Sequence, residues 1–181
     1  EYIYTSAIAA SLPDNAVRTA LQKFKAPKGK ILLVSIGKAA WQMAKTAYDC
    51  LYEKIDAGIA ITKYAHSKGS IGDLEIYEAA HPVPDENGIK ATKRALDLTE
   101  GLAEDDVVIF LVSGGGSALF EYVDFPLSDL SKVTSQMLAS GASIEEMNTV
   151  RKHLSEVKGG RFAEPVYPAK IYAVVLSDVV S

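Results

Sequence analysis

The stretch VVIFLVSGGGSALFE, from Val107 to Glu121, decides the fold. It begins with an unbroken run of apolar and mostly β-branched residues, as in a strand that is buried on both faces of a sheet. Ser113 and three consecutive glycines follow directly, and glycine allows backbone conformations that other residues avoid. The stretch therefore predicts a buried strand that opens into a tight glycine-rich loop.

Several other apolar runs along the chain have the same character. Between them, apolar residues recur at helical spacing, most clearly from Lys38 to Glu53 and from Glu86 to Thr99. This alternation is typical of an α/β protein with a three-layer architecture, in which helices flank a parallel, doubly wound sheet. We expect strands buried on both faces at Ile31–Ile36, Gly58–Ile61, Leu74–Ala79, Val107–Val112 and Ile171–Leu176.

The remaining segments are expected to be helical. Pro13 is placed to begin a helix that carries Val17 and Leu21 on one face and covers one side of the sheet. The stretch from Leu127 to Ala163 has no strand pattern and is expected to form two or three helices. No repeat, low-complexity linker or second-domain boundary is visible, which indicates one domain over residues 1–181.

The composition predicts a globular protein with a small-molecule site. Hydrophobic residues make up 48% of the chain and charged residues 23%, and the formal net charge is −4. Basic residues are spread along the chain, so neither nucleic acid nor a membrane is expected as a partner, and no apolar run approaches a membrane-helix length. The single Cys50 is expected to be a buried thiol, which favours a cytoplasmic location. The missing initial Met suggests a trimmed N-terminus.

Ligands of open α/β sheets bind at the carboxyl ends of the strands, so the residues after each apolar run are candidates for the site. Gly37 and Lys38 follow the first run, where a lysine at a helix N-terminus would suit a phosphate or carboxylate. A solvated lysine is the alternative. HPVPD follows the third run, and there His81 could contact a ligand, although helix capping by Asp85 explains the motif equally well.

The glycine triplet is the strongest of these candidates. Gly114, Gly115, Gly116 and Ser117 allow successive N–H groups to point into one concavity, a nest for anionic oxygens. The loop is not a Walker A sequence, and Leu119 stands where both GxGxxG and GxSxG need their last glycine. A tight strand-to-helix turn without a ligand is the alternative.

A polar strip is expected on the helix that includes residues 145–158. Arg151 and Lys158 fall at helical spacing with Asn148 and Ser155. An apolar stripe runs beside them, formed by Met147, Val150, Leu154 and Val157. Two cations and a following pair of glycines suggest a second anion-binding corner, and a solvated helix face is an equally good explanation.

Five motifs, in the order IGKAA, HPVPD, LVSGGGSALFE, LASGASIEEMNTVRKHLSEVKGGRFA and VVLSDVVS, resemble the glycerate 2-kinase family, whose members are often labelled hydroxypyruvate reductases. The resemblance runs through nearly the whole chain. It implies transfer of a phosphoryl group from ATP to the 2-hydroxyl of D-glycerate, with Mg²⁺, by a two-domain protein. The larger, N-terminal domain of such a protein is Rossmann-like, and a smaller C-terminal domain closes over the cleft.

The resemblance also implies roles for the candidate residues. Lys38 matches the family's lysine near the reacting groups, and Ser113 to Ser117 match its glycine-rich loop. Arg151, Lys158 and Asp178 fall on family motif positions, and Asp178 would hold magnesium directly or through water. Phosphoryl transfer depends mainly on positioning and charge neutralisation, which an anion nest and a lysine can supply.

The chain departs from the family at its C-terminal end. Ser181 stands in place of a family glycine, and the aspartate that normally follows is missing. We therefore expect a truncated larger domain without the smaller one, with little or no kinase activity alone. A sugar-phosphate-binding, isomerase-like module is the chief alternative, and a hydroxypyruvate reductase comes third because the dinucleotide fingerprint is missing. A homo-oligomer is left open.

Overall fold

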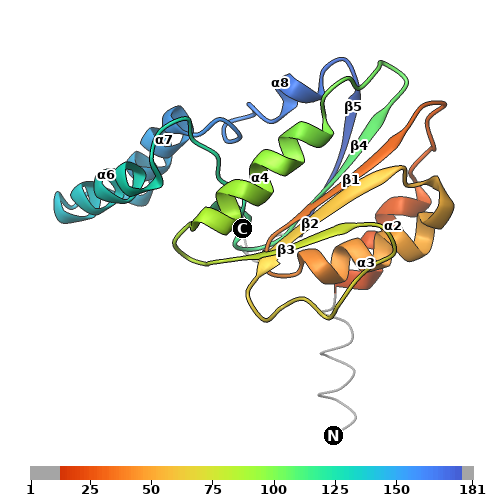
Figure 1. Ribbon diagram of the computed structural model, residues 1–181, viewed down its shortest axis with the longest axis horizontal. Coiled ribbons are helices and arrows are strands. Elements are labelled where there is room, and N and C mark those ends of the chain that lie inside the picture. The colour runs from red at the N-terminus through yellow and green to blue at the C-terminus, as the bar shows by residue number, and fades with distance from the viewer. Residues whose placement is uncertain (1–12, 177–181) are drawn as a thin grey trace, which may run out of the picture.

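The computed structural model describes residues 13–176 of the chain (Figure 1). Its strands are β1 (Ile31–Ile36), β2 (Ala57–Lys63), β3 (Glu75–Ala79), β4 (Val107–Val112) and β5 (Lys170–Val175). Its helices are α2 (Pro13–Gln22), α3 (Ala40–Leu51), the 3₁₀ turn η1 (Tyr52–Lys54), α4 (Glu86–Leu98), α5 (Gly116–Leu119), α6 (Leu127–Ala139), α7 (Ile144–Leu154) and α8 (Ala163–Val166). Strands and helices alternate as the sequence predicts, except that no helix lies between β2 and β3.

The five strands form one parallel sheet in the order β3-β2-β1-β4-β5. The chain moves outward from β1 to β2 and β3, and then returns to the other side of β1 with β4 and β5. The strand order therefore reverses between β1 and β4, which is where α/β sheets of this kind bind their ligands. The predicted α/β fold with a parallel sheet is confirmed.

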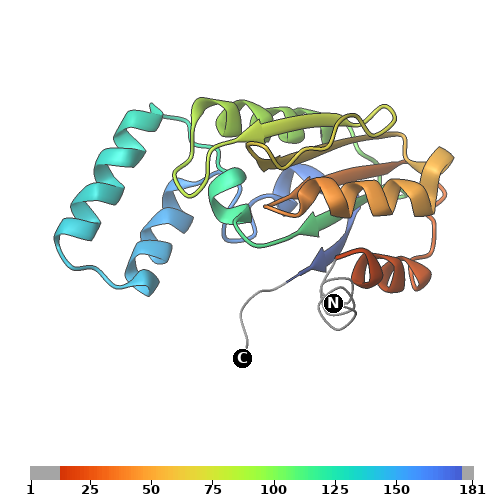
Figure 2. The same ribbon diagram turned by 90° about the horizontal axis from the view of Figure 1, so that it is seen from below.

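Helices cover both faces of the sheet, and Figure 2 shows the three layers edge-on. On one face, Leu33 of β1 and Ile109 of β4 pack with the buried sides of α2 and α3. On the other, Val34 and Val108 pack with Ala91 of α4 and with α8. Successive residues of a strand point to opposite faces, so the continuous apolar runs follow from burial on both sides.

Two expectations about burial are wrong. β5 is the last strand in the sheet order, and Val175 is 66% exposed because no described segment covers that side of the strand. Cys50 is exposed near the end of α3, so it is not the buried thiol that its apolar neighbours suggested. In residues 13–176, no helix is long and apolar enough to cross a bilayer.

Helices α6 and α7 extend away from the sheet as an antiparallel pair (Figures 1 and 2). Leu130 of α6 is buried, whereas α7 buries none of its residues. A capping box begins α7, in which the Ser143 side chain accepts the N–H of Glu146, and the Glu146 carboxylate accepts the N–H of Ser143. We call residues 127–154 the helical hairpin.

The predicted helical strip does not extend beyond the hairpin. α7 ends at Leu154, and Ser155 is extended. The Ser155 hydroxyl accepts the N–H groups of Val157 and Lys158, both at 3.3 Å, and such a local bond competes with helix continuation. The expectation of one helix carrying both Arg151 and Lys158 is therefore wrong.

Candidate functional site

Hydrogen bonds join the loops that follow β1 and β4. The N–H of Lys38 donates to the Gly114 carbonyl at 2.9 Å, and the N–H of Ala39 donates to Ser113 Oγ at 3.0 Å. The same hydroxyl lies 3.2 Å from the Ile36 carbonyl oxygen and donates to it. Ser113 is buried, so its hydroxyl joins the two loops, and its predicted contact with a ligand stays untested.

Gly37 is required for this junction. Its φ is +112°, and an added Cβ would overlap Ser113 Oγ and lie 2.5 Å from the Ser113 carbonyl oxygen. A side chain here would push the loops apart. The glycine therefore sets the position from which Lys38 extends. α3 begins at Ala40, so Lys38 lies just before the helix rather than in its first turn, and its side chain is exposed.

The glycine-rich loop presents unused backbone donors. Gly116 donates its N–H to the Ser113 carbonyl at 3.2 Å, and α5 begins there. Within residues 13–176, the N–H groups of Gly114, Gly115 and Ser117 donate to no acceptor. Ser117 is also exposed. Unused donors at the carboxyl end of a central strand are what an anion nest needs, and the predicted role of these residues stays a prediction.

Basic side chains gather beside this loop. A Cβ on Gly115 would lie 2.9 Å from the His81 ring and 3.2 Å from Lys38 Cγ, so both side chains pack against the loop. His66 Nδ1 lies 3.0 Å from the Lys38 carbonyl oxygen. Burial lowers the pKa of His81, and the charges of Lys38, Lys63 and His66 lower it further. His81 is therefore neutral at pH 7 within a positively charged cluster.

The HPVPD loop also begins a helix. Asp85 is the N-cap of α4, and its carboxylate accepts the N–H of Gly88 at 2.9 Å and the Tyr64 hydroxyl at 2.7 Å. The capping explanation of this motif is therefore confirmed. Capping by Asp85 does not exclude a ligand contact by His81, because the same loop places His81 beside the glycine-rich loop.

Arg151 and Lys158 come together, although they lie on different elements. Both approach Glu121, whose side chain is 1% exposed: Lys158 Nζ lies 2.5 Å from Glu121 Oε2, and Arg151 Nη2 lies 3.9 Å from it. Lys158 also donates to the Phe120 carbonyl at 3.2 Å, and Arg151 donates to the Ser117 carbonyl at 3.5 Å. Arg151 therefore reaches the last carbonyl of the glycine-rich loop, and Lys158 reaches the Phe120 carbonyl three residues further along the chain.

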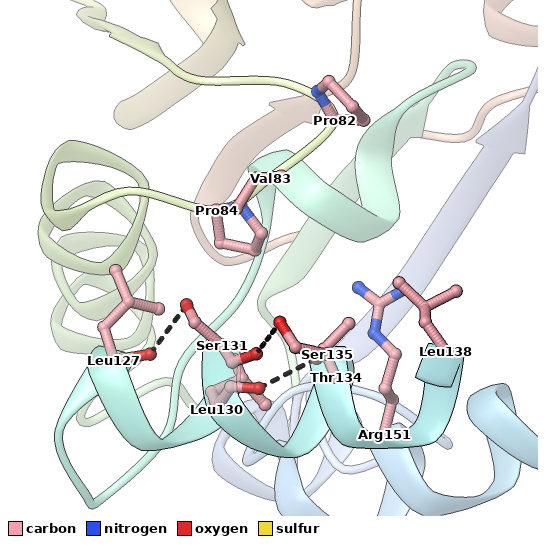
Figure 3. Close-up of a pocket in the computed structure, with 10 residues that line it drawn as sticks. All are labelled: Pro82, Val83, Pro84, Leu127, Leu130, Ser131, Thr134, Ser135, Leu138 and Arg151. Atoms are coloured by element: carbon pink, nitrogen blue, oxygen red, sulfur yellow. Dashed lines mark hydrogen bonds between the residues drawn. The ribbon is translucent and has the colours of Figure 1, made fainter. Parts of the chain in front are cut away.

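A cavity of about 200 Å³ separates the HPVPD loop from α6 (Figure 3). The hydroxyls of Ser131, Thr134 and Ser135 donate to carbonyls of their own helix, so the wall along α6 is largely apolar. In Figure 3, Arg151 reaches from α7 toward the loop. The cavity is lined by Pro82, Val83, Pro84, Leu127, Leu130, Ser131, Thr134, Ser135, Leu138 and Arg151.

Comparison with known families gives a match over the whole chain. A family model described as "Domain of unknown function (DUF4147)" matches residues 1–181. The chain belongs to this family. The names of the proteins similar to this DUF4147 chain refer to two different activities. It is 58% identical to a D-glycerate 2-kinase of Thermotoga maritima and 43% identical to an Agrobacterium vitis protein named "Putative hydroxypyruvate reductase".

These relatives are longer than the DUF4147 chain. The match covers 98% of this chain and 42% of the Thermotoga maritima relative, and 98% and 40% for the Agrobacterium vitis relative. A crystal structure of glycerate kinase from Thermotoga maritima aligns with a TM-score of 0.90 and 55% identity, over 98% of this chain and 43% of that one. A Pyrococcus horikoshii structure aligns with a TM-score of 0.89 and 38% identity, over 99% of this chain and 43% of that one.

Sequence reasoning missed three residues of the candidate site. Lys63 ends β2 and His66 follows it, so the strand-end rule that found Lys38 would also have found them. Glu121 directly follows the apolar pair Leu119 and Phe120, and an acidic residue in that position was the signal in the sequence that could have identified it.

Asp178, the predicted magnesium ligand, lies outside the described residues. Within them, no group of three or more His, Cys, Asp or Glu side chains gathers as a metal site.

Proposed function

We propose that this chain forms one wall of the cleft of an ATP-dependent glycerate 2-kinase. The enzyme transfers the γ-phosphoryl group of ATP to the 2-hydroxyl of D-glycerate, which gives ADP, 2-phosphoglycerate and the proton of the hydroxyl. The main support is the place of Lys38, beside the unused N–H groups of the glycine-rich loop where the strand order reverses. The names of the similar proteins point to the same reaction.

In this mechanism the chain supplies position and positive charge. The N–H groups of Gly114, Gly115 and Ser117 bind the oxygens of the transferring phosphoryl group. The Lys38 ammonium group neutralises the charge that develops on these oxygens, and its backbone is fixed by the bond to Gly114. His81 is neutral at pH 7, so it offers one ring N–H without adding to the charge.

Magnesium enters the proposal only through the resemblance. Phosphoryl transfer from ATP uses Mg²⁺ to neutralise phosphate charge, and the resemblance gives this ligand role to Asp178. The described part of the site is basic and suits anionic oxygens rather than a divalent cation. Every step assigned above to Lys38, His81 and the glycine-rich loop is independent of the metal.

Replacement of Lys38 by Ala in the complete gene product tests this role. We expect kcat to fall about 10²- to 10³-fold, because a preorganised charge on the transferring group is lost. The exposed Lys38 side chain makes little contribution to folding, so the stability should change little. Lys45→Ala is the matched control, because Lys45 lies on the same loop-helix unit and pairs with Asp49 at the surface. Near-normal turnover of Lys38→Ala would contradict the proposal.

Three assays separate the reaction from its alternatives. The complete gene product should convert D-glycerate and ATP to 2-phosphoglycerate, with the phosphate position assigned by ³¹P NMR. Oxidation of NADH by hydroxypyruvate would instead support the reductase named for the Agrobacterium vitis relative. Thermal stabilisation by sugar phosphates, without any stabilisation by ATP, would support a phosphosugar-binding module.

Residues 1–181 alone should show no phosphorylation of D-glycerate. Measurable turnover by them would refute the expectation that the rest of the cleft is needed.

A further inference from the structure

Glu121 is a buried charge that takes part in none of the steps above. Its side chain is 1% exposed, and neither carboxylate oxygen receives a hydrogen bond of good geometry from the described residues. An isolated carboxylate in such a place is strongly unfavourable unless positive charge compensates it. Lys158 and Arg151 supply that charge. The three side chains therefore form one electrostatic unit.

We propose that Glu121 is a positioning residue: its buried carboxylate holds Arg151 beside the Ser117 carbonyl and Lys158 beside the Phe120 carbonyl, and so fixes the unused N–H groups of the glycine-rich loop. This inference depends on the proposed function in one respect: it takes a phosphoryl oxygen as the anion that the unused N–H groups bind. Glu121 itself lies behind the loop, and it acts through the two cations.

A chain of hydrogen bonds connects this unit to the anion side of the loop. Arg151 Nη2 lies 3.5 Å from the Ser117 carbonyl oxygen, a long contact whose attraction is mainly electrostatic. The peptide group after Ser117 donates from Ala118 to the Gly115 carbonyl at 3.1 Å. The next peptide group donates from Gly116 to the Ser113 carbonyl at 3.2 Å.

The series of hydrogen bonds ends at a peptide group whose N–H is unused. The Ser113 carbonyl shares its peptide group with the N–H of Gly114, which has no acceptor among the described residues. Linked hydrogen bonds polarise one another, so positive charge at one end strengthens the donor at the other. Arg151 therefore acts on the Gly114 N–H through the loop backbone, without touching the anion.

Glu121 is needed because its partners would not stay in place without it. Burial lowers the pKa of Lys158, and the neighbouring charge of Arg151 lowers it further, whereas Glu121 opposes both effects. Without the carboxylate, Lys158 and Arg151 would repel each other, and Lys158 would lose its proton more easily. The bond from Lys158 to the Phe120 carbonyl would weaken as a result.

Glu121→Gln in the complete gene product tests the proposal, because glutamine keeps the shape and removes the charge. Amide hydrogen exchange over residues 113–120 should become about tenfold faster, while exchange in β1 and α4 stays as in the wild type. The kcat/KM for phosphoryl transfer should fall about 10- to 100-fold, because the donors are misplaced. Glu156→Gln is the control, since Glu156 is a half-exposed carboxylate 3.6 Å from Arg161, and it should leave both measurements unchanged.

A double substitution covers the case in which the single variant does not fold. Glu121→Leu with Lys158→Met replaces the buried ion pair by apolar side chains of similar size, which proteins often tolerate. The same local increase in exchange is expected.

Unchanged exchange over residues 113–120 in either variant would overturn the proposal. So would an equal increase throughout the protein, which would show a purely structural role. If the wild type transfers no phosphoryl group, the proposed function fails, and the exchange measurement still decides the role of Glu121.

Discussion

The sheet with its covering helices and the helical hairpin are built on different principles. In the sheet, neighbouring residues of β1 such as Leu33 and Val34 are both fully buried, one against each helical layer. In the hairpin, Leu138 is 61% exposed and Ile144 is 60% exposed. Burial therefore specifies the first region, whereas helix caps and polar contacts specify the second. The loops of the candidate site lie where the two regions meet.

The same substitution in both regions should give the largest contrast. Leu33→Ala removes a fully buried side chain from β1 and should lower the free energy of unfolding by about 2–5 kcal/mol. Leu138→Ala removes an exposed side chain from α6 and should change it by less than about 0.5 kcal/mol. Urea denaturation followed by circular dichroism measures both values. Similar losses would show that the hairpin is buried against another surface, and the comparison would fail.

The sheet could be predicted from the sequence because burial on both faces leaves continuous apolar runs. The runs of β1 and β4 match the observed strands at both ends. β5 shows the limit of this rule, because it also contains an apolar run but is the last strand of the described sheet and is largely exposed. An apolar run shows that the side chains of a strand are suited to burial. The position of the strand in the sheet determines whether those side chains are covered.

The hairpin was predicted less well because its signals are local. Two or three helices were expected from Leu127 to Ala163, and α6 and α7 are present there. The apolar spacing continues beyond Leu154, however, where the Ser155 side chain ends the helix. The site shows the same division. Lys38 and the glycine-rich loop follow from strand ends, whereas the pairing of Glu121 with Lys158 joins distant segments and depends on tertiary structure.

The loop junction at Gly37 should show a smaller but specific effect. Gly37→Ala places a side chain at a positive φ, which costs roughly 1–3 kcal/mol of stability, and the overlap with Ser113 adds to this cost. Gly101→Ala is the matched control, since its φ is +73° and its added Cβ would meet nothing within 4 Å.

Thermal and urea unfolding measure the stability loss of each variant. The loss in Gly101→Ala reports backbone strain alone, so the additional loss in Gly37→Ala reports the steric overlap with Ser113. In the complete gene product, Gly37→Ala should also lower the turnover of the proposed kinase reaction, because Lys38 and the glycine-rich loop are displaced together. Equal stability losses in the two variants would mean that the junction yields easily, and that the site is less rigid than the buried strands beneath it.

The smallest effect is expected within the hairpin, at its capping box. Ser143→Ala removes the side chain that accepts the N–H of Glu146, which should cost α7 about 1 kcal/mol of local stability. Amide exchange should become faster in residues 144–154, while the urea midpoint of the whole protein changes little, because α7 buries no residue against the sheet. Ser140→Ala is the control, since the Ser140 hydroxyl donates to the Met137 carbonyl of its own helix rather than to α7. If exchange also increased in β1 and β4, the hairpin and the sheet would unfold as one cooperative unit. The contacts of Arg151 with Glu121 and with the Ser117 carbonyl would then couple the two regions more strongly than the burial of α7 suggests.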